Sequence, residues 1–401
     1  MFRRKAKPAK AKEVEFPINL EELGLFINDQ DQLRQIENPD EPFEYYIHGK
    51  SNGYVYDKKL AAPPREKERM NERRREAVDE CLRRIVIQRL EDMGMKKVAL
   101  PLGAAPDEPH LSILISENLE TCKKVLILSP DSSGGNLGVW GIRQMQQDTI
   151  NFGSMVDTVR HANEDGYAVV ILNPSQTIWD YEAKTPMNFL SWKAKDKKTA
   201  ALDHAKNSIP GNKTPEDHVE YVFNNVLRPM VLKDAEIDVI AGGFSAYSIV
   251  KYLNSNWDEW KGRMFAMAFS ESSHAINNIT SEDFRLFLRL RTRNYIVHND
   301  TRGEYLLDPR FGCATYSSAT MFPQAIIPEC RELLREYLRN AHDNPGNCNP
   351  DVPVILGDIP DRDEWLEQLS SMKEGNPAFG WDAPIPAEMS ADDAKISEIT
   401  V

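Results

Sequence analysis

Short apolar runs alternate with amphipathic stretches from residue 96 to residue 341. Runs rich in β-branched residues predict strands at 98–102, 111–115, 125–128, 168–172, 237–241, 264–269, 295–297 and 313–317. Apolar residues at helical spacing predict helices at 65–93, 155–162, 215–230, 246–253, 283–290 and 326–341. Strands that are apolar along their whole length and alternate with helices are typical of a mostly parallel sheet covered on both faces. The pattern therefore predicts a doubly wound α/β fold.

The pattern outside this core predicts an N-terminal extension and two tails. Residues 1–12 are basic with almost no apolar content, which predicts a flexible tail. Residues 13–95 form an extension that ends in the long predicted helix, whose amphipathic second half we expect to pack on the core. We expect the α/β domain at 96–345, with a polar insertion near 175–211. Residues 346–401 are expected to form an acidic, largely disordered tail.

Composition argues against membrane, secreted and metal-binding proteins. Hydrophobic residues make up 41% of the 401 residues, which is enough for a sizeable core. Apolar runs are far shorter than a membrane span, and no apolar segment follows the basic N-terminus as it would in a secretory signal. The five cysteines lack CxxC spacing, and the histidines lack H-x-x-H or HExxH spacing. We expect a soluble nuclear and cytoplasmic protein without cofactor, metal or membrane contact.

A glycine-rich turn follows one of the central predicted strands, where an α/β-hydrolase carries its nucleophile. In that fold a G-x-S-x-G turn between strand and helix exposes the serine. Here the chain reads Gly242-Gly243-Phe244-Ser245, and two registers are open. Ser245 is the nucleophile in one, although Tyr247 then replaces the glycine that allows close approach of helix and strand. In the other register Gly243 stands at the nucleophile position and no nucleophile remains.

The acid and the base of a triad are expected later in the chain than the nucleophile. Asp300 follows a late predicted strand and is acceptable as the acid. No histidine lies between residues 315 and 341, after the last predicted strand. His298 precedes that strand, and His342 follows the closing helix, where we expect it to lie on the surface. The base is therefore missing from its expected place.

A second group of polar residues follows the predicted strand at 264–269. Glu271, Ser272 and His274 are a candidate remnant of an acid–base cluster. The alternative interpretation is a helix N-cap region with satisfied side chains. If the protein is active, the candidate triad is Ser245, Asp300 and His274.

The loop expected to supply the oxyanion hole is also altered. After the predicted strand at 125–128 the chain continues through Asp131, Ser132 and Gly134. Asp131 would place a negative charge beside a developing oxyanion, which opposes the transition state. Because the nucleophile, the base and the oxyanion loop are all degenerate, we expect a pseudo-hydrolase that binds other proteins.

Several segments between residues 13 and 345 resemble fungal proteins that carry the Argonaute-binding-protein-two (Arb2) domain. They read FPINLEELG at 16–24, KKVALPLG at 96–103, PGNKTP at 210–215 and IDVI at 237–240, and continue to the closing helix. Animal relatives keep A-H-S-Y-G-G at the elbow and D-S-V-H after the next strand. Aligned without gaps, their serine falls on Gly243 and their histidine on His274.

The resemblance implies an α/β-hydrolase-like fold and a non-catalytic role in small-RNA-directed silencing. The implied partner is Argonaute, in a chaperone complex that holds duplex siRNA before heterochromatin assembly. The same domain occurs in an animal cotranscriptional regulator and in a fungal class II histone deacetylase, so a deacetylase-associated chromatin regulator is a second hypothesis. A residual hydrolase that uses Ser245 is a third. We expect RNA to associate through Argonaute, because a net charge of −13 opposes direct phosphate binding. The oligomeric state stays open.

Overall fold

The computed structural model describes residues 15–44, 65–133, 135–194 and 202–349. The predicted tail at 1–12 and most of the predicted tail at 346–401 lie outside these ranges. Within the described ranges, no helix combines the length and the apolar character that a bilayer span requires.

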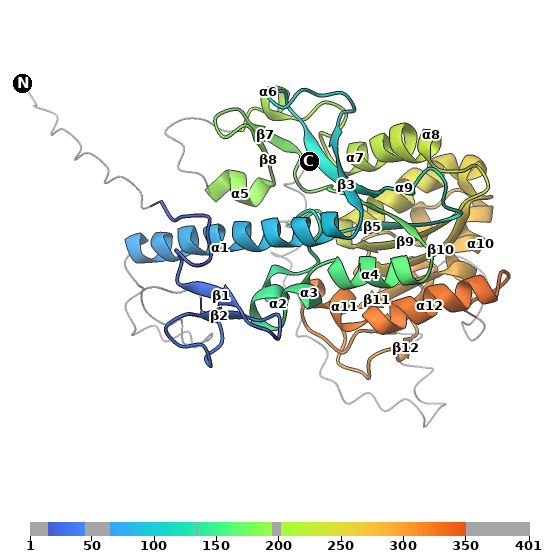
Figure 1. Ribbon diagram of the computed structural model, residues 1–401. Helices are drawn as coiled ribbons and strands as arrows, with labels where there is room; N and C mark the ends of the chain where they lie inside the picture. Colours follow the sequence, from blue (N-terminus) through green and yellow to red (C-terminus); the bar gives the residue numbers. More distant parts are fainter. Residues whose placement is uncertain (1–14, 45–64, 134, 195–201, 350–401) are drawn as a thin grey trace, which may run out of the picture. The chain divides into compact units, whose positions relative to one another are not determined.

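The described residues form one nine-stranded sheet in the order β12-β13-β11-β10-β9-β5-β6-β4-β3 (Figure 1). The bounds are β3 Met95–Leu100, β4 Leu111–Ser116, β5 Lys124–Ser129, β6 Ala168–Ile171, β9 Glu236–Gly242, β10 Met264–Ser270, β11 Thr292–Ile296, β12 Tyr305–Leu306 and β13 Ala314–Ser317. The strands from β6 through β5, β9, β10 and β11 to β13 are parallel, and β4 is antiparallel to both of its neighbours. The alternating pattern predicts this doubly wound, mostly parallel sheet, and the resemblance implies its α/β-hydrolase-like character; both expectations are confirmed.

Helices cover both faces of the sheet. Their bounds are α1 Arg65–Asp92, α2 Ile142–Gln147, α3 Ile150–Gly153, α4 Val156–Glu164, α5 Phe189–Ala194, α6 His204–Asn207, α7 Pro215–Val222, α8 Arg228–Met230, α9 Gly243–Trp260, α10 Glu282–Arg291, α11 Ile326–Glu329 and α12 Arg331–Asp343. A π-helical turn at Phe223–Leu227 joins α7 to α8. Figure 1 shows α1, α4 and α12 on one side of the sheet and α7, α9 and α10 on the other.

The structure adds short elements that the sequence pattern did not predict. They are the antiparallel pairs β1 Leu25–Ile27 with β2 Leu33–Gln35 and β7 Ile178–Asp180 with β8 Thr185–Met187. Strand β3 begins at Met95, three residues before its predicted start, because Met95 to Leu100 all pair with β4. It ends at Leu100, before the predicted end at residue 102, because Pro101 has no N–H to donate to a neighbouring strand. Two- and three-residue strands carry too little periodicity to be recognised in a sequence.

The second half of α1 packs on the sheet through one apolar stripe. Val78, Leu82, Val86 and Leu90 recur every four residues, and all four are fully buried. They belong to the core cluster that also contains residues of β5, β6, α4 and α12. In the described structure, the helix of the N-terminal extension is thus part of the main core.

Replacing Leu82 by alanine is expected to lower the free energy of unfolding by about 2–5 kcal/mol, because the side chain is fully buried and leaves a cavity. The matched control is Leu286→Ala in α10, whose side chain is 48% exposed and should change stability by about 0.5 kcal/mol or less. Urea denaturation measures both. Equal effects would show that α1 does not contribute to the core.

Candidate functional site

The carboxyl ends of four parallel strands bring the predicted site residues to one edge of the sheet. Asp131 follows β5, Gly243 follows β9, Glu271 follows β10 and Asp300 follows β11. In open α/β sheets this edge is where ligands bind. The four residues therefore mark the candidate active site.

The turn between β9 and α9 has the geometry of a nucleophile elbow, with Gly243 at its apex. The strand ends at Gly242, and the helix begins at the next residue. Gly243 has a φ of +51°, a left-handed conformation that side chains other than glycine rarely adopt. Gly242 has an extended backbone with φ of −107°. The register that the backbone adopts thus places a glycine where a hydrolase carries its nucleophile.

The carboxylate of Asp131 fills the space in front of this glycine. A Cβ atom on Gly243 would lie 2.5 Å from Cγ and Oδ1 of Asp131. Oδ1 of Asp131 accepts a hydrogen bond from the backbone N–H of Phe244 at 3.4 Å. Ser133 holds the same carboxylate, donating from its N–H to Oδ1 at 3.1 Å and from its hydroxyl to Oδ2 at 2.5 Å. The start of α9 favours an anion at this position.

The carboxylate of Asp131 lies where a hydrolase would bind the oxyanion of the transition state. In an α/β-hydrolase, the N–H of the residue after the nucleophile donates to the oxyanion. That residue is Phe244 here, and its N–H already points to Asp131. A second negative charge beside Asp131 would be repelled and not stabilised. Ser132 lies half-buried in the turn after Asp131, and Gly134 lies outside the described residues.

Ser245 faces the interior of the protein. Its side chain is fully buried on the first turn of α9, and its hydroxyl forms a short hydrogen bond with the hydroxyl of Ser129 at the end of β5. Within the described chain, no hydrogen bond joins Ser245 to Asp300 or to His274. The geometry gives Ser245 a role in joining α9 to the sheet.

Glu271, Ser272 and His274 form two separate arrangements. Glu271 has a φ of +48°, and its carboxylate accepts a hydrogen bond from the N–H of Val297; burial raises its pKa. His274 lies 2.8 Å through Nε2 from the carbonyl oxygen of Phe311, so Nε2 carries the proton. Its Nδ1 then accepts from the hydroxyl of Ser272 at 2.6 Å.

This histidine is neutral and inaccessible. Burial lowers the pKa of His274 to about 4. Both His274 and Ser272 are 97% buried, since each side chain exposes only 3% of its surface. A serine–histidine hydrogen bond is therefore present, but it is closed off from solvent in this structure.

The predicted acid pairs with a different histidine. Oδ2 of Asp300 lies 3.3 Å from Nδ1 of His298, and both side chains are partly exposed. The backbone carbonyl of Asp300 accepts a hydrogen bond from the hydroxyl of Ser317 at the end of β13. After β13, the chain presents Met321 and Phe322 at the surface in place of a histidine.

The prediction that His342 lies on the surface is wrong. His342 is in the last turn of α12, and its side chain is only 10% exposed. Nε2 lies 2.7 Å from Oδ2 of Asp238, and Nδ1 lies 3.1 Å from Oε2 of Glu236. Asp238 also accepts from the hydroxyl of Tyr167 at 2.8 Å. These contacts lie near the amino end of β9, at the opposite end of the strand from the elbow, and the acid Asp238 between the apolar residues of this strand was the signal for them.

His218 is a second buried histidine that is held by hydrogen bonds within the protein. It is fully buried in α7, where Nε2 accepts from the N–H of Asn173 at 3.0 Å and Nδ1 lies 2.7 Å from Oδ1 of Asn212. Burial lowers its pKa to about 3. Among the described residues, no group of three or more His, Cys, Asp or Glu side chains could hold a metal ion.

Known proteins resemble the chain over most of its length. The model of the Arb2 domain matches residues 16–302. The cotranscriptional regulator ARB2A homolog of Xenopus tropicalis is 25% identical over 72% of this chain and 71% of its own length. The human cotranscriptional regulator ARB2A is 23% identical over 75% of this chain and 76% of its own.

Two solved structures match the chain at low identity and low TM-score. A histone deacetylase from Saccharomyces cerevisiae has a TM-score of 0.42 and 14% identity, over 66% of this chain and 98% of that chain. A Pyrobaculum calidifontis esterase has a TM-score of 0.32 and 11% identity, over 67% of this chain and 93% of that chain. Both TM-scores are below 0.5, so no functional conclusion follows from these structures.

Proposed function

Because the chain belongs to the Arb2 domain family, we propose that it is a non-catalytic adaptor that binds protein partners in gene regulation. The observation that carries this proposal is the elbow. Gly243 occupies the nucleophile position, and the carboxylate of Asp131 occupies the space in front of it. A nucleophile and an oxyanion hole are the two parts that acyl transfer requires at this place. The relatives that match most of the chain are named as regulators, which supports the same proposal.

We further propose that Argonaute is the partner, in a chaperone complex for duplex siRNA that acts before heterochromatin assembly. The support for this finer assignment is the resemblance to Argonaute-binding proteins in the segments at 16–24, 96–103 and 210–215. The second candidate is a chromatin regulator associated with a histone deacetylase. Its support is the same resemblance, because the domain also occurs in a fungal class II histone deacetylase.

Affinity purification of the tagged full chain from its own cells, followed by mass spectrometry, separates these candidates. If Argonaute is the partner, it should be recovered with the chain even after nuclease treatment. The tag alone is the control. Recovery of a histone deacetylase without Argonaute supports the second candidate and contradicts the first. Recovery of neither protein contradicts both.

Short RNA duplexes are expected not to bind the isolated protein tightly at physiological salt, because a net charge of −13 repels phosphates. A gel shift over a range of salt concentrations measures this. Weak binding that is lost on deletion of residues 1–12, which include Arg3, Arg4 and Lys5, agrees with indirect association through Argonaute. Tight binding at physiological salt contradicts it.

A further inference from the structure

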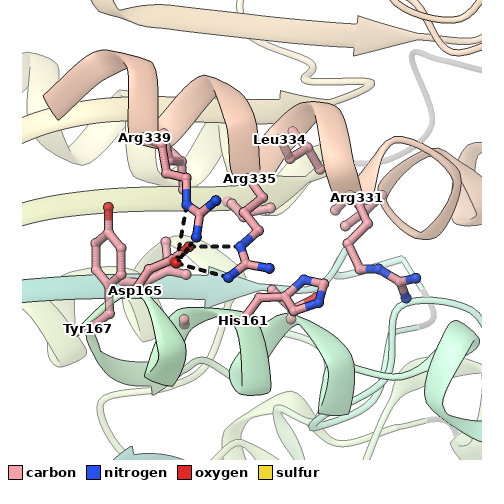
Figure 2. Close-up of a pocket in the computed structure, with 13 residues that line it drawn as sticks. His161, Asp165, Tyr167, Arg331, Leu334, Arg335 and Arg339 are labelled. Atoms are coloured by element: carbon pink, nitrogen blue, oxygen red, sulfur yellow. Dashed lines mark hydrogen bonds and ion pairs between the residues drawn. The ribbon is translucent and has the colours of Figure 1, made fainter. Parts of the chain in front are cut away.

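The space that helices α4 and α12 leave between them is too small for a ligand (Figure 2). Its volume is about 30 Å³, which is room for one or two water molecules. Arg335 and Arg339 of α12 already pair with Asp165 of α4 beside this space, at 2.9 Å and 2.5 Å. A protein partner must therefore contact the outer surface of the molecule.

Two large apolar side chains are exposed in the loop that follows β13. Met321 exposes 59% of its surface and Phe322 exposes 47%, and the neighbouring Pro323 is also exposed. Because β13 is parallel to β11, this loop lies at the carboxyl edge of the sheet. Adjacent exposed apolar residues of this size are typical of surfaces that contact other proteins.

Hydrogen bonds hold both ends of this loop. Ala319 has a φ of +53°, a conformation that residues other than glycine adopt only where their surroundings enforce it. The hydroxyl of Ser318 donates to the carbonyl oxygen of Ile296 at 2.7 Å. At the other end, the N–H of Ala325 donates to the carbonyl oxygen of Phe322 at 2.8 Å. The backbone thus presents the apolar residues in a fixed arrangement, which lowers the entropy cost of binding a partner.

Arg143 of α2 lies over one of these side chains. Its Cζ atom is 4.3 Å from the centre of the Phe322 ring, within the range of a cation–π contact. Its Nε donates to Oε1 of Gln147 at 2.7 Å, and no carboxylate among the described residues forms an ion pair with it. Its Nη atoms can therefore donate to an acceptor on another molecule.

We propose that Met321, Phe322 and Arg143 form a docking surface for a protein segment that carries an acidic residue beside an apolar one. This proposal rests on the proposed adaptor function. The apolar side chain of the partner packs on Met321 and Phe322, and its carboxylate accepts hydrogen bonds from the guanidinium group of Arg143. A second copy of this chain fits less well, because a two-fold contact through this surface brings the two Arg143 side chains together.

Fluorescence anisotropy of a labelled synthetic peptide of alternating glutamate and leucine residues tests this surface on the full chain. Saturable binding is expected, and analogues with glutamine for glutamate or serine for leucine should bind about five-fold more weakly or less. Phe322→Ser and Arg143→Glu should each weaken binding of the original peptide about five-fold or more, because each removes one of the two contacts. The matched controls Leu286→Ser and Arg285→Glu, at exposed positions of α10, should leave the affinity unchanged.

Three results would contradict the docking surface. They are absence of saturable binding, equal binding of the peptide and its analogues, and equal affinity of the surface variants and the α10 controls. If Phe322→Ser fails to fold, Met321→Ser at the more exposed position gives the same test. A short RNA duplex that competes with the peptide at equal affinity would show that the surface attracts phosphate, which also rejects the proposal.

Affinity purification with Phe322→Ser and Arg143→Glu separates this proposal from the adaptor function. Argonaute or a histone deacetylase that is recovered equally with the wild-type chain and with both variants would reject the docking surface and leave the adaptor function standing. A loss with both variants that does not occur with Arg285→Glu supports the docking surface. Recovery of neither protein with any chain contradicts the proposed partners, and the peptide titration then decides on the surface alone.

Discussion

Replacing Gly243 by valine is expected to lower the free energy of unfolding by about 3 kcal/mol or more. Two costs act together. The φ of +51° is unfavourable for any β-branched residue, and the new Cβ would lie 2.5 Å from the carboxylate of Asp131. Thermal and urea denaturation of the purified variant measure the loss.

The matched control for this substitution is Gly262→Val. A Cβ atom on Gly262 would have no other atom within 4 Å, and the residue has no positive φ, so its replacement should cost much less. The double variant Gly243→Ala with Asp131→Ala should recover part of the loss seen in Gly243→Ala, because it removes the steric clash and keeps the backbone strain. An unchanged melting temperature for Gly243→Val would show that the elbow is assigned wrongly.

Acidification from pH 6.5 to pH 4 is expected to destabilise the protein through two buried histidines. In the folded state, burial lowers the pKa of His274 to about 4 and that of His218 to about 3, whereas an unfolded histidine has a pKa of about 6.5. The unfolded state therefore binds more protons in this window. The stability that is fully present above pH 6.5 is lost as the pH falls, by up to about 1.4 kcal/mol per pH unit for each histidine.

Variants of His218 separate this effect from the titration of carboxylates. His218→Gln should lower stability at pH 7, because it disturbs the hydrogen bonds with Asn173 and Asn212, and it should also flatten the dependence on pH between 6.5 and 4. His204→Gln, at an exposed position in α6, is the control and should keep the wild-type slope. Urea midpoints at several pH values give the slopes. Identical slopes for the wild type and His218→Gln would refute the assignment.

The sequence predicted the main sheet and most of its helices because their apolar residues repeat over several turns or a whole strand. The long helix at 65–93 was predicted to within a residue of α1, and the strand at 237–241 lies within β9. The glycine pair at 242–243 also marked the elbow correctly as a sharp strand-to-helix turn. Apolar repeats and glycine pairs are local features of the sequence. They predict helices, strands and turns without knowledge of tertiary contacts.

The environments of the site residues could not be predicted in the same way. Asp131 and Gly243 are 112 positions apart, and only the pairing of β5 with β9 brings them together. The amphipathic pattern predicts that the closing helix ends at residue 341. His342 was therefore expected beyond the helix, on the surface. The structure extends α12 to Asp343 and joins His342 to the buried Asp238. Hydrogen-bond partners of this kind are properties of the tertiary fold.

Labelling with a fluorophosphonate probe, read by intact mass, tests the proposed absence of hydrolase chemistry most directly. The probe reports on any serine activated as a nucleophile. The wild-type protein is expected to gain no covalent adduct under conditions that fully label an active esterase, because Gly243 carries no nucleophile and Ser245 is buried against Ser129. An adduct on the wild-type protein that disappears in Ser245→Ala would contradict the proposed adaptor function.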